Sequence, residues 1–368
     1  MNRKIFISLF LGTLISVVTL YLAFRNVPLS ELGNYLVSID TLWTLAAVVL
    51  VLISFVMRTV RWQYILGSTH KVGFWQAFHP LMIGFMINSV LPGRVGELAR
   101  PLILSKKIDI PISTGLATVV IERVFDLVML LALFTIVSTG LTINPDVGID
   151  FGGYRLNRDV LQSVFDGMLK LSVVLLICIV LISLEKPRKM IKKMTLYLPK
   201  ILFFLGDPGK KKFRLKVIRP VNQMIDNIAS AMMLIKKPKR LSICFLLSIV
   251  IWIVVAISWY VFTLGCPEIR LTPAQATAAL VIICFAIALP SVPGYWGLWE
   301  AAGIFALMLF GVTGKDAAGY TLANHAVQMF PVILVGLVSA WHSGVNILQV
   351  SYQRKSGQPQ EKIPTEGH

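Results

Sequence analysis

The chain has 368 residues, of which 56% are hydrophobic and only 14% are charged. Soluble domains carry roughly 25% charged residues, so this composition excludes a single water-soluble core and indicates an integral membrane protein. The formal net charge is +17, but sixteen Lys and Arg residues lie within residues 185–240, against three acidic residues. Membrane proteins concentrate basic residues on their cytoplasmic side, so we expect contacts with anionic lipid headgroups there and no nucleic acid partner.

Apolar runs long enough to cross a bilayer recur along the chain. A hydrocarbon core of about 30 Å needs about 20 residues of helix, and spanning strands would instead alternate polar and apolar residues. The sequence therefore predicts an all-α polytopic membrane protein with about six full spans, at residues 5–24, 42–57, 113–137, 169–184, 241–264 and 322–343. The first run is long and lacks a small-residue cleavage site, so we interpret it as a retained span rather than a signal peptide.

Two further apolar regions, residues 74–104 and 273–310, are interrupted by Pro and Gly at their centres. Basic residues accumulate on the side that is not translocated, which puts both termini, Arg58 and Arg61 on the cytoplasmic side. Both ends of the first broken region then lie on that side, and both ends of the second lie outside. Each region is either a pair of complete spans or a re-entrant hairpin of half-helices, and the central Pro and Gly favour the hairpin.

The centres of the two broken regions are similar to each other. Residues 91–97 read LPGRVGE and residues 292–300 read VPGYWGLWE, so both contain P-G-x-x-G and a following glutamate. Each motif is the third of four elements, namely two spans, the broken region and a last span. Because the second series begins on the opposite side of the membrane, the pattern predicts an inverted-topology repeat with a transport site at the two breaks.

This pattern divides the chain into five parts. They are a first membrane repeat (1–140), an outer loop with a span (141–184), a basic cytoplasmic loop (185–240), the rest of a second membrane repeat (241–349) and a disordered tail (350–368). Within the basic loop, apolar residues recur at helical spacing over residues 217–235. They predict an amphipathic helix that lies either on the lipid surface or beneath the bundle.

No motif for catalysis or metal binding is present. The four cysteines show neither a disulfide framework nor paired metal spacing. The chain contains no G-x-x-x-x-G-K-[ST] loop for nucleotide phosphates, and no H-E-x-x-H or G-x-S-x-G motif. We therefore expect no catalytic residue, no metal and no cofactor, and a protein that is not an enzyme.

Charged side chains within the apolar regions must have a partner or a function, because each unsatisfied charge at bilayer depth costs at least about 2.5 to 3.5 kcal/mol. They are Arg94, Glu97, Arg100, Glu122, Arg123, Asp126 and Glu300. Helical spacing lets Glu97 face both Arg94 and Arg100, and puts Glu122 and Asp126 on one face. These residues form either a neutralising network that joins the first hairpin to the next span, or an anion site. The anion site would follow from Arg94 and Arg100, which have one local carboxylate between them and so leave an excess of positive charge.

The break before these residues favours the anion site. Pro92 and Gly93 let the chain turn, so the next helix is expected to begin near Gly96 inside the protein and to point free N–H groups at the site. Helix N-termini and arginine side chains both bind phosphate oxygens.

The second break carries different chemistry. Its hinge residues are Pro293, Gly294 and Gly297. Tyr295 and Trp296 are either packing residues at the membrane interface or a wall of the pathway. Glu300 has no evident local cation, so we expect it to pair with Arg94 or Arg100 across the halves, or to be protonated part of the time and so to couple transport to protons.

Four uncharged polar residues lie near breaks or helix ends. We expect Asn88 and Asn324 to bond the irregular backbone rather than a ligand, because backbone groups at membrane depth need partners. We expect His79 and His325 to bond neighbouring carbonyl oxygens rather than to relay protons.

Three motifs, in this order, resemble the flippase-like membrane family that includes the transmembrane region of lysylphosphatidylglycerol synthases: Asn88-x-x-Leu91-Pro92-x-Arg94-x-Gly96-Glu97-x-x-Arg100, Glu122-Arg123-x-x-Asp126 and Pro290-x-x-Pro293-Gly294-x-x-Gly297-x-x-Glu300. The resemblance covers nearly the whole chain and implies a polytopic lipid translocase of bacteria or archaea. In the aminoacyl-lipid members a separate soluble domain attaches the amino acid. This chain resembles a stand-alone translocase without that domain.

We therefore predict a lipid flippase of the cytoplasmic membrane that works by alternating access. Its substrate would be a phospholipid, an aminoacyl-phospholipid or a polyprenyl-phosphate-linked glycolipid. Arg94 and Arg100 would bind phosphate, with Glu97 orienting them. The gating or coupling residues would be Glu122, Arg123, Asp126 and Glu300. The alternatives are a secondary carrier for a small soluble anion and a membrane transferase, or the partner of a lipid-modifying enzyme, in lipid-linked glycan modification.

Overall fold

The computed structural model describes residues 28–67, 70–91, 94–108, 110–140, 149–151, 154–156, 184–201, 213–219, 238–288 and 293–344, with isolated residues at 14–25, 163–181 and 222–226. Several predictions lie wholly or largely outside these residues: those for the spans at 5–24 and 169–184, the hinge residues Pro92 and Gly93, the amphipathic helix at 217–235 and the tail at 350–368.

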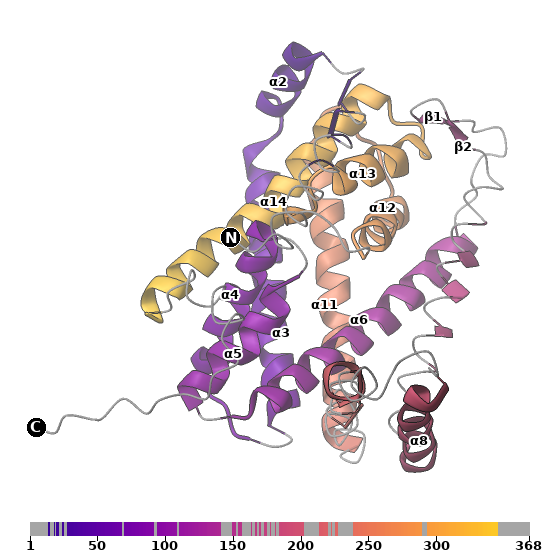
Figure 1. The fold of residues 1–368 in the computed structure, drawn as a ribbon. Helices are drawn as coiled ribbons and strands as arrows, with labels where there is room; N and C mark the ends of the chain where they lie inside the picture. The colour runs from indigo at the N-terminus through magenta and orange to yellow at the C-terminus, as the bar shows by residue number, and fades with distance from the viewer. Residues whose placement is uncertain are drawn as a thin grey trace, which may run out of the picture.

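Helices form nearly all of the described secondary structure, which confirms the prediction of a helical protein (Figure 1). The first half contains α2 (Leu29–Val37), α3 (Thr41–Leu66), α4 (Phe74–Val90), α5 (Gly96–Ile108) and α6 (Ile112–Gly140). The second half contains α11 (Pro238–Leu264), α12 (Pro273–Ala286), the short 3-10 helix η3 (Pro293–Tyr295), α13 (Leu298–Met308) and α14 (Gly314–His342).

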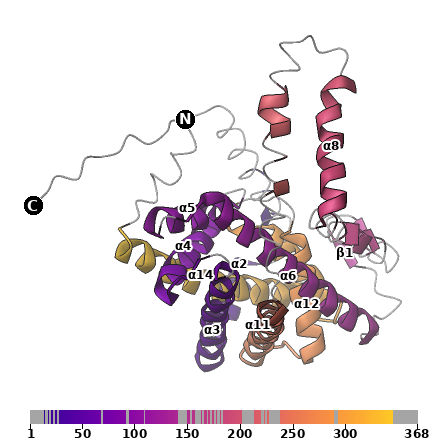
Figure 2. The same cartoon turned by 90° about the horizontal axis from the view of Figure 1, so that it is seen from below.

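The segment between the halves contains short elements. Strands β1 (Ile149–Phe151) and β2 (Tyr154–Leu156) form an antiparallel hairpin in which Ile149 is opposite Leu156, a feature that the hydropathy pattern does not predict. They are followed by α8 (Glu185–Ile201) and the π-helical turn η1 (Arg214–Ile218). In Figure 2, α8 stands apart from the main bundle.

Three of the described helices, α3, α11 and α14, are long and apolar enough to cross a membrane. They correspond to the predicted spans at 42–57, 241–264 and 322–343. The predicted span at 113–137 corresponds to α6, which has 29 residues but carries Glu122, Arg123 and Asp126 in its middle. Two of the long helices begin at a side chain that accepts an N–H: Asp40 accepts from Leu42 at the start of α3, and Thr313 accepts from Asp316 at the start of α14.

The two central helices, α3 and α11, are antiparallel neighbours. At one end the amide of Asp40, before α3, donates to the carbonyl of Gly265, just after α11, over 2.9 Å. At the other end Arg240 at the start of α11 donates to the carbonyl of Tyr64 near the end of α3 over 3.5 Å.

Helix contacts in one half have counterparts in the other half. α4 packs on α5 as α12 packs on α13, α5 contacts α6 as α13 contacts α14, and α3 contacts α4 as α11 contacts α12. The contacts between the halves are also matched, since α4 packs against α14 and α12 packs against α6. The contact between α4 and α14 requires Gly336, because a Cβ there would overlap Met86 of α4. In the contact between α6 and α12, the rings of Phe134 and Phe285 pack edge-on with their centres 5.8 Å apart.

Candidate functional site

The first break lies between α4 and α5, which fold back on each other. The amide of Gly96 donates to Oδ1 of Asn88 over 2.8 Å, so Asn88 bonds the irregular backbone as predicted. A Cβ on Gly96 would overlap the carbonyl oxygen of Gly84, which explains why glycine is needed at this close approach. α5 begins at Gly96, where the sequence predicts it, and continues through Pro101 to Ile108.

The second break lies between α12 and α13 and uses left-handed backbone. Gly294 has φ 63°, Tyr295 has φ 61° and Gly297 has φ 89°. α13 then begins at Leu298, and Oε2 of Glu300 accepts a 2.7 Å hydrogen bond from the amide of Gly297. The glutamate therefore caps its own helix.

Arg94 and Tyr295 occupy the same position in the two P-G-x-x-G motifs, and both have left-handed backbone, with φ values of 54° and 61°. They also meet in space, because the Arg94 guanidinium lies 5.9 Å from the centre of the Tyr295 ring. Arg94 Nη2 donates to the carbonyl of Ile287 at the end of α12 over 2.8 Å. A Cβ on Gly294 would lie 2.8 Å from the carbonyl oxygen of Ser89, so the two breaks are in direct contact.

Charged side chains extend from the first break into α6. Glu97 Oε1 lies 3.9 Å from Arg94 Nη1 and 3.8 Å from Arg123 Nε. Arg123 Nη2 lies 3.4 Å from Oδ2 of Asp126. Glu97 therefore faces Arg94, as the spacing predicts, but its second partner is Arg123 of α6 rather than Arg100.

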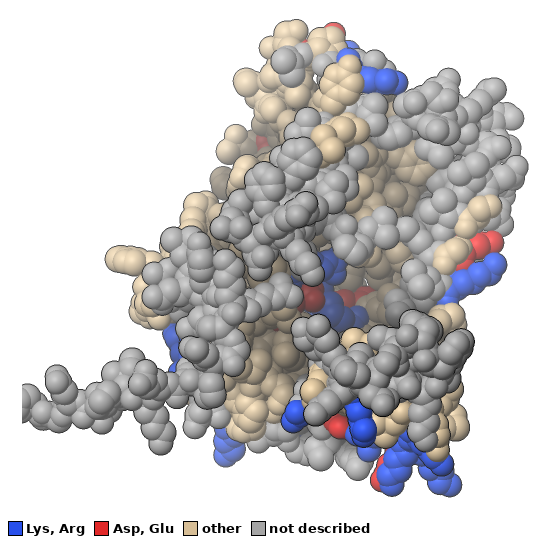
Figure 3. All heavy atoms as spheres, in the orientation of Figure 1, with Lys and Arg blue, Asp and Glu red and all other residues tan. Residues whose placement is uncertain are grey.

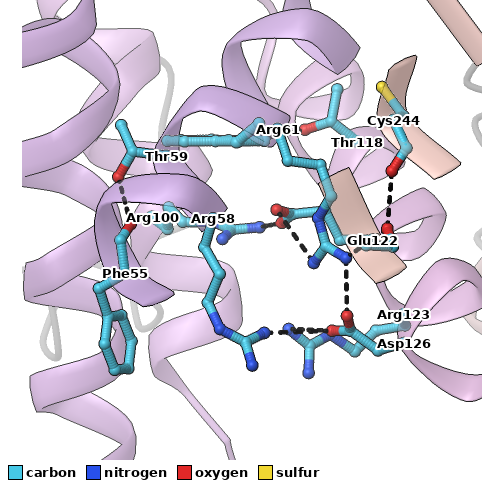
Figure 4. A network of polar contacts seen from close by, with 12 residues as sticks. Phe55, Arg58, Thr59, Arg61, Arg100, Thr118, Glu122, Arg123, Asp126 and Cys244 are labelled. Atoms are coloured by element: carbon cyan, nitrogen blue, oxygen red, sulfur yellow. Dashed lines mark hydrogen bonds and ion pairs between the residues drawn. The ribbon is translucent and has the colours of Figure 1, made fainter. Parts of the chain in front are cut away.

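The same series of contacts continues through α6 to α3 and α5 (Figure 4). Asp126 Oδ1 accepts a 2.8 Å hydrogen bond from Arg61 Nη1, and its Oδ2 lies 3.7 Å from Arg58 Nη1. Glu122 Oε1 lies 3.8 Å from Arg61 Nη2, and Oε2 accepts a hydrogen bond from Arg100 Nη2. We call these eight residues the arginine network: Arg58, Arg61, Arg94, Glu97, Arg100, Glu122, Arg123 and Asp126.

The predicted end of this span at residue 57 is too early for the helix, because Arg58 and Arg61 still belong to α3. α3 continues to Leu66, and Arg61 is fully buried within it. Arg61 Nη1 also donates to Oγ of Ser248 in α11 over 2.9 Å, so it links the network to the second half. The signal in the sequence is the apolar helical spacing that continues through Trp62, Ile65 and Leu66 after the two arginines.

The arginine network is buried at one end, which we call its deep end and which contains Arg61 and Arg100. It is partly exposed at the first break. The side chains of Arg61 and Arg100 are 0% and 4% exposed, and the Arg100 guanidinium lies 4.3 Å from the centre of the Trp62 ring. In contrast, the side chains of Arg94 and Arg123 are 33% and 37% exposed. In Figure 3 basic and acidic atoms are visible in a recess at mid-height, while most other visible charged atoms lie near the edges of the molecule.

Glu300 is fully buried and has a local partner. Its Oε1 lies 2.5 Å from Nδ1 of His325 in α14. The expectation that Glu300 pairs with Arg94 or Arg100 is therefore wrong, because the start of its own helix and an imidazole already satisfy the carboxylate. The expectation that His325 bonds a carbonyl oxygen is wrong for the same reason.

Two indole rings enclose the imidazole of His325. The ring of Trp299 stacks on it at 4.5 Å with an interplanar angle of 8°, and the ring of Trp296 lies 4.4 Å away. Trp296 therefore packs on this pair.

Other polar side chains in the bundle have no hydrogen-bond partner among the described residues. Asn324 and Thr321 of α14 are buried beside Trp259 and Tyr320, and the space between these side chains is too small to hold a water molecule. The backbone bond expected for Asn324 is not found. His79 packs on the rings of its neighbours, and its Nδ1 is likewise unpaired within the described part of the chain.

Nothing in the described part of the chain resembles a metal site, since no three His, Cys, Asp or Glu side chains gather there. Cys244, Cys266 and Cys284 are free thiols. Burial raises the pKa of Cys266, in the turn after α11, to about 12. This thiol is therefore protonated and unreactive at neutral pH.

The chain matches one protein family and is similar to two archaeal proteins. The family described as "Lysylphosphatidylglycerol synthase TM region" matches residues 9–336. The UPF0104 membrane protein MJ1078 of Methanocaldococcus jannaschii is 24% identical over 263 residues, which cover 72% of this chain and 96% of that protein. The glycosyltransferase AglD of Haloferax volcanii is 32% identical over 133 residues, which cover 35% of this chain but only 21% of that protein. No solved structure matches the chain.

Proposed function

Because the chain belongs to the lysylphosphatidylglycerol synthase TM region family, we propose that it moves a lipid with an anionic headgroup across the cytoplasmic membrane. The observation that carries this proposal is the arginine network at the contact between the two breaks. Arginine N–H groups match phosphate oxygens in pairs, and they bind most strongly where water is limited. The headgroup would bind in this recess while the acyl or prenyl tails stay in the bilayer.

The matched helix contacts support an inverted-topology repeat. α3 and α11 have equivalent contacts and are antiparallel, so an approximate two-fold axis between them would lie in the plane of a membrane that both cross. The four helices of the breaks, α4, α5, α12 and α13, have 17, 13, 14 and 11 residues. All are shorter than the about 20 residues of a full span, which favours two re-entrant hairpins that enter from opposite sides.

Alternating access would follow from rocking one half against the other around the touching breaks. Arg94 joins the halves through the carbonyl of Ile287, so this contact would open and close as the halves move. Within the network, Glu122 and Asp126 hold the deeper arginines in place, and Arg123 lies at the accessible edge. The buried pair of Glu300 and His325 is the candidate for coupling this movement to a proton.

The charge distribution supports a cytoplasmic position for the end of the molecule that carries α8. α8 carries Lys186, Arg188, Lys189, Lys192 and Lys193, and it lies at the opposite end of the molecule from α2 and the β1–β2 hairpin (Figure 1). Basic residues stay on the side that is not translocated, so the end with α8 would face the cytoplasm.

Translocation by the purified protein tests the proposal. In proteoliposomes that contain a fluorescent anionic lipid, we expect Arg94→Gln to slow the movement between leaflets by about 10- to 100-fold, the loss typical of one well-placed charged hydrogen bond. The matched control is Lys315→Gln, which removes an exposed positive charge outside the network. Equal rates for the wild type, Arg94→Gln and protein-free liposomes would contradict the proposal.

A second candidate function is supported by the similarity to the glycosyltransferase AglD. The chain would then serve as a membrane partner of an enzyme that modifies lipid-linked glycans. This candidate predicts that a glycosyltransferase co-purifies with the chain and that the chain alone moves no lipid.

A further inference from the structure

The arginine network carries more positive than negative charge. It contains five arginines and three carboxylates, so its net charge among the described residues is +2, although each arginine lies within 4 Å of a carboxylate. The contacts form one connected series that ends on Arg94 at the break and on Arg100 at the deep end, with Arg58 as a branch at Asp126. Arginines and carboxylates alternate along this series. Because both ends and the branch are arginines, the network has two more arginines than carboxylates.

Unused hydrogen-bond donors occur along the whole network, and two of them, Nε of Arg94 and Nε of Arg123, belong to its accessible arginines. Five buried guanidinium nitrogens have no hydrogen-bond partner among the described residues: Nε of Arg61, Arg94, Arg100 and Arg123, and Nη2 of Arg61. Buried polar groups are nearly always hydrogen-bonded in folded proteins, so a cluster of free donors indicates a missing acceptor. A tetrahedral phosphate supplies several strong acceptors at once.

The accessible edge of the network suits such a group. Arg94 and Arg123 flank Glu97, and the distances from its Oε1 to the nearest nitrogen of each are 3.9 and 3.8 Å, longer than a hydrogen bond. Both arginines therefore keep donor capacity for an incoming anion. Tyr295 of the second break lies beside this edge, with the centre of its ring 5.9 Å from the Arg94 guanidinium.

We propose that the network binds a doubly charged phosphate group, as carried by the phosphomonoester or diphosphate headgroup of a lipid. This inference rests on the proposed function and narrows its substrate class. Two negative charges neutralise the excess, whereas a phosphodiester such as phosphatidylglycerol leaves one positive charge over. A lysyl-phosphatidylglycerol headgroup has two ammonium groups and one phosphodiester, so it is a net cation and is repelled.

Binding of lipids with identical dioleoyl tails tests the charge match. We expect the protein in nanodiscs to bind phosphatidic acid at least about tenfold more tightly than phosphatidylglycerol, and to show no specific binding of lysyl-phosphatidylglycerol. The second ionisation of a phosphomonoester has a pKa of about 6, so the preference for phosphatidic acid should shrink from pH 8 to pH 5. Native mass spectrometry and titration by tryptophan fluorescence report both effects.

Charge variants make the test specific to this network. Arg123→Gln lowers the excess by one charge and should reduce the preference for phosphatidic acid, whereas Glu97→Gln raises the excess and should increase it. Lys315→Gln removes a charge elsewhere and should leave the preference unchanged. Thermal unfolding of each variant checks that the fold is retained, and both network positions are partly exposed.

The outcomes separate this inference from the proposed function. A preference for phosphatidic acid without movement between leaflets would support the dianion site and contradict translocation. Translocation with equal binding of phosphatidic acid and phosphatidylglycerol would overturn the dianion site alone. Competition by inorganic phosphate as strong as that of phosphatidic acid would support the phosphate chemistry and overturn a lipid as its source.

Discussion

The two breaks share one left-handed motif position and differ in chemistry. Both restart a helix after P-G-x-x-G, and the third residue of each motif, Arg94 or Tyr295, has a left-handed φ. The carboxylates that follow are not equivalent, because Glu97 comes directly after its glycine and Glu300 comes three residues after its own. Glu300 therefore reaches back to cap its own helix, while Glu97 is free to face arginines on two elements.

This difference shows that the hinge is set by a local motif and the chemistry by the neighbours that packing supplies. The first break meets arginines from α3 and α6 and forms a cationic network. The second break meets His325 and two tryptophans and forms a small, enclosed pair. We therefore expect anion binding at the first break and not at the second.

The largest effect on stability is expected at the deep end of the arginine network. Glu122→Leu removes the carboxylate that faces both Arg61 and Arg100, and leaves two buried guanidinium groups without it. Loss of one partner of a buried ion pair costs about 3 to 5 kcal/mol, so the unfolding temperature of the purified protein should fall strongly. A variant as stable as the wild type would show that water already compensates these charges.

The second break should respond less to the same kind of change. Glu300→Gln retains the shape of the side chain but weakens the bonds to Gly297 and His325. We expect a loss of about 1 to 3 kcal/mol in stability and a change in the fluorescence of the tryptophans around His325. If Glu300→Gln lost more stability than Glu122→Leu, the expectation that the first break is the more sensitive one would be wrong.

The hinge itself can be tested at Gly294. Alanine would be strained at a φ of 63° and its Cβ would lie 2.8 Å from the Ser89 carbonyl oxygen. We expect Gly294→Ala to cost about 1 to 2 kcal/mol and to loosen the contact between the breaks. Cross-linking of cysteines introduced at Ser89 and Tyr295 would detect that separation, and an unchanged cross-linking yield would argue against it.

The smallest effect is expected at the surface. Lys192 Nζ lies 2.7 Å from Oδ2 of Asp226, but both side chains are substantially exposed. Exposed pairs contribute about 0 to 1 kcal/mol, so Asp226→Asn should leave the unfolding temperature nearly unchanged. It serves as the baseline for the other three substitutions, and a large effect would indicate that α8 contributes to the stability of the helix bundle.

Much of the fold is readable from local sequence because apolar run length and helix breakers act within one segment. The positions of α11 and α14, the start of α5 at Gly96 and the glycines of the second break all follow from such local signals. The end of α3 is harder to predict, because the apolar spacing that continues to Leu66 is interrupted by Arg58 and Arg61, whose carboxylate partners come from another helix.

The partners of the buried charges were decided by tertiary structure alone. Spacing along one helix predicts that Glu97 can face Arg94, but it says nothing of Arg123, Arg61 or His325, which arrive from other helices. A charge in a low-dielectric interior pairs with the nearest opposite charge in space. That distance is set by how the two halves pack, which no single segment of the sequence encodes.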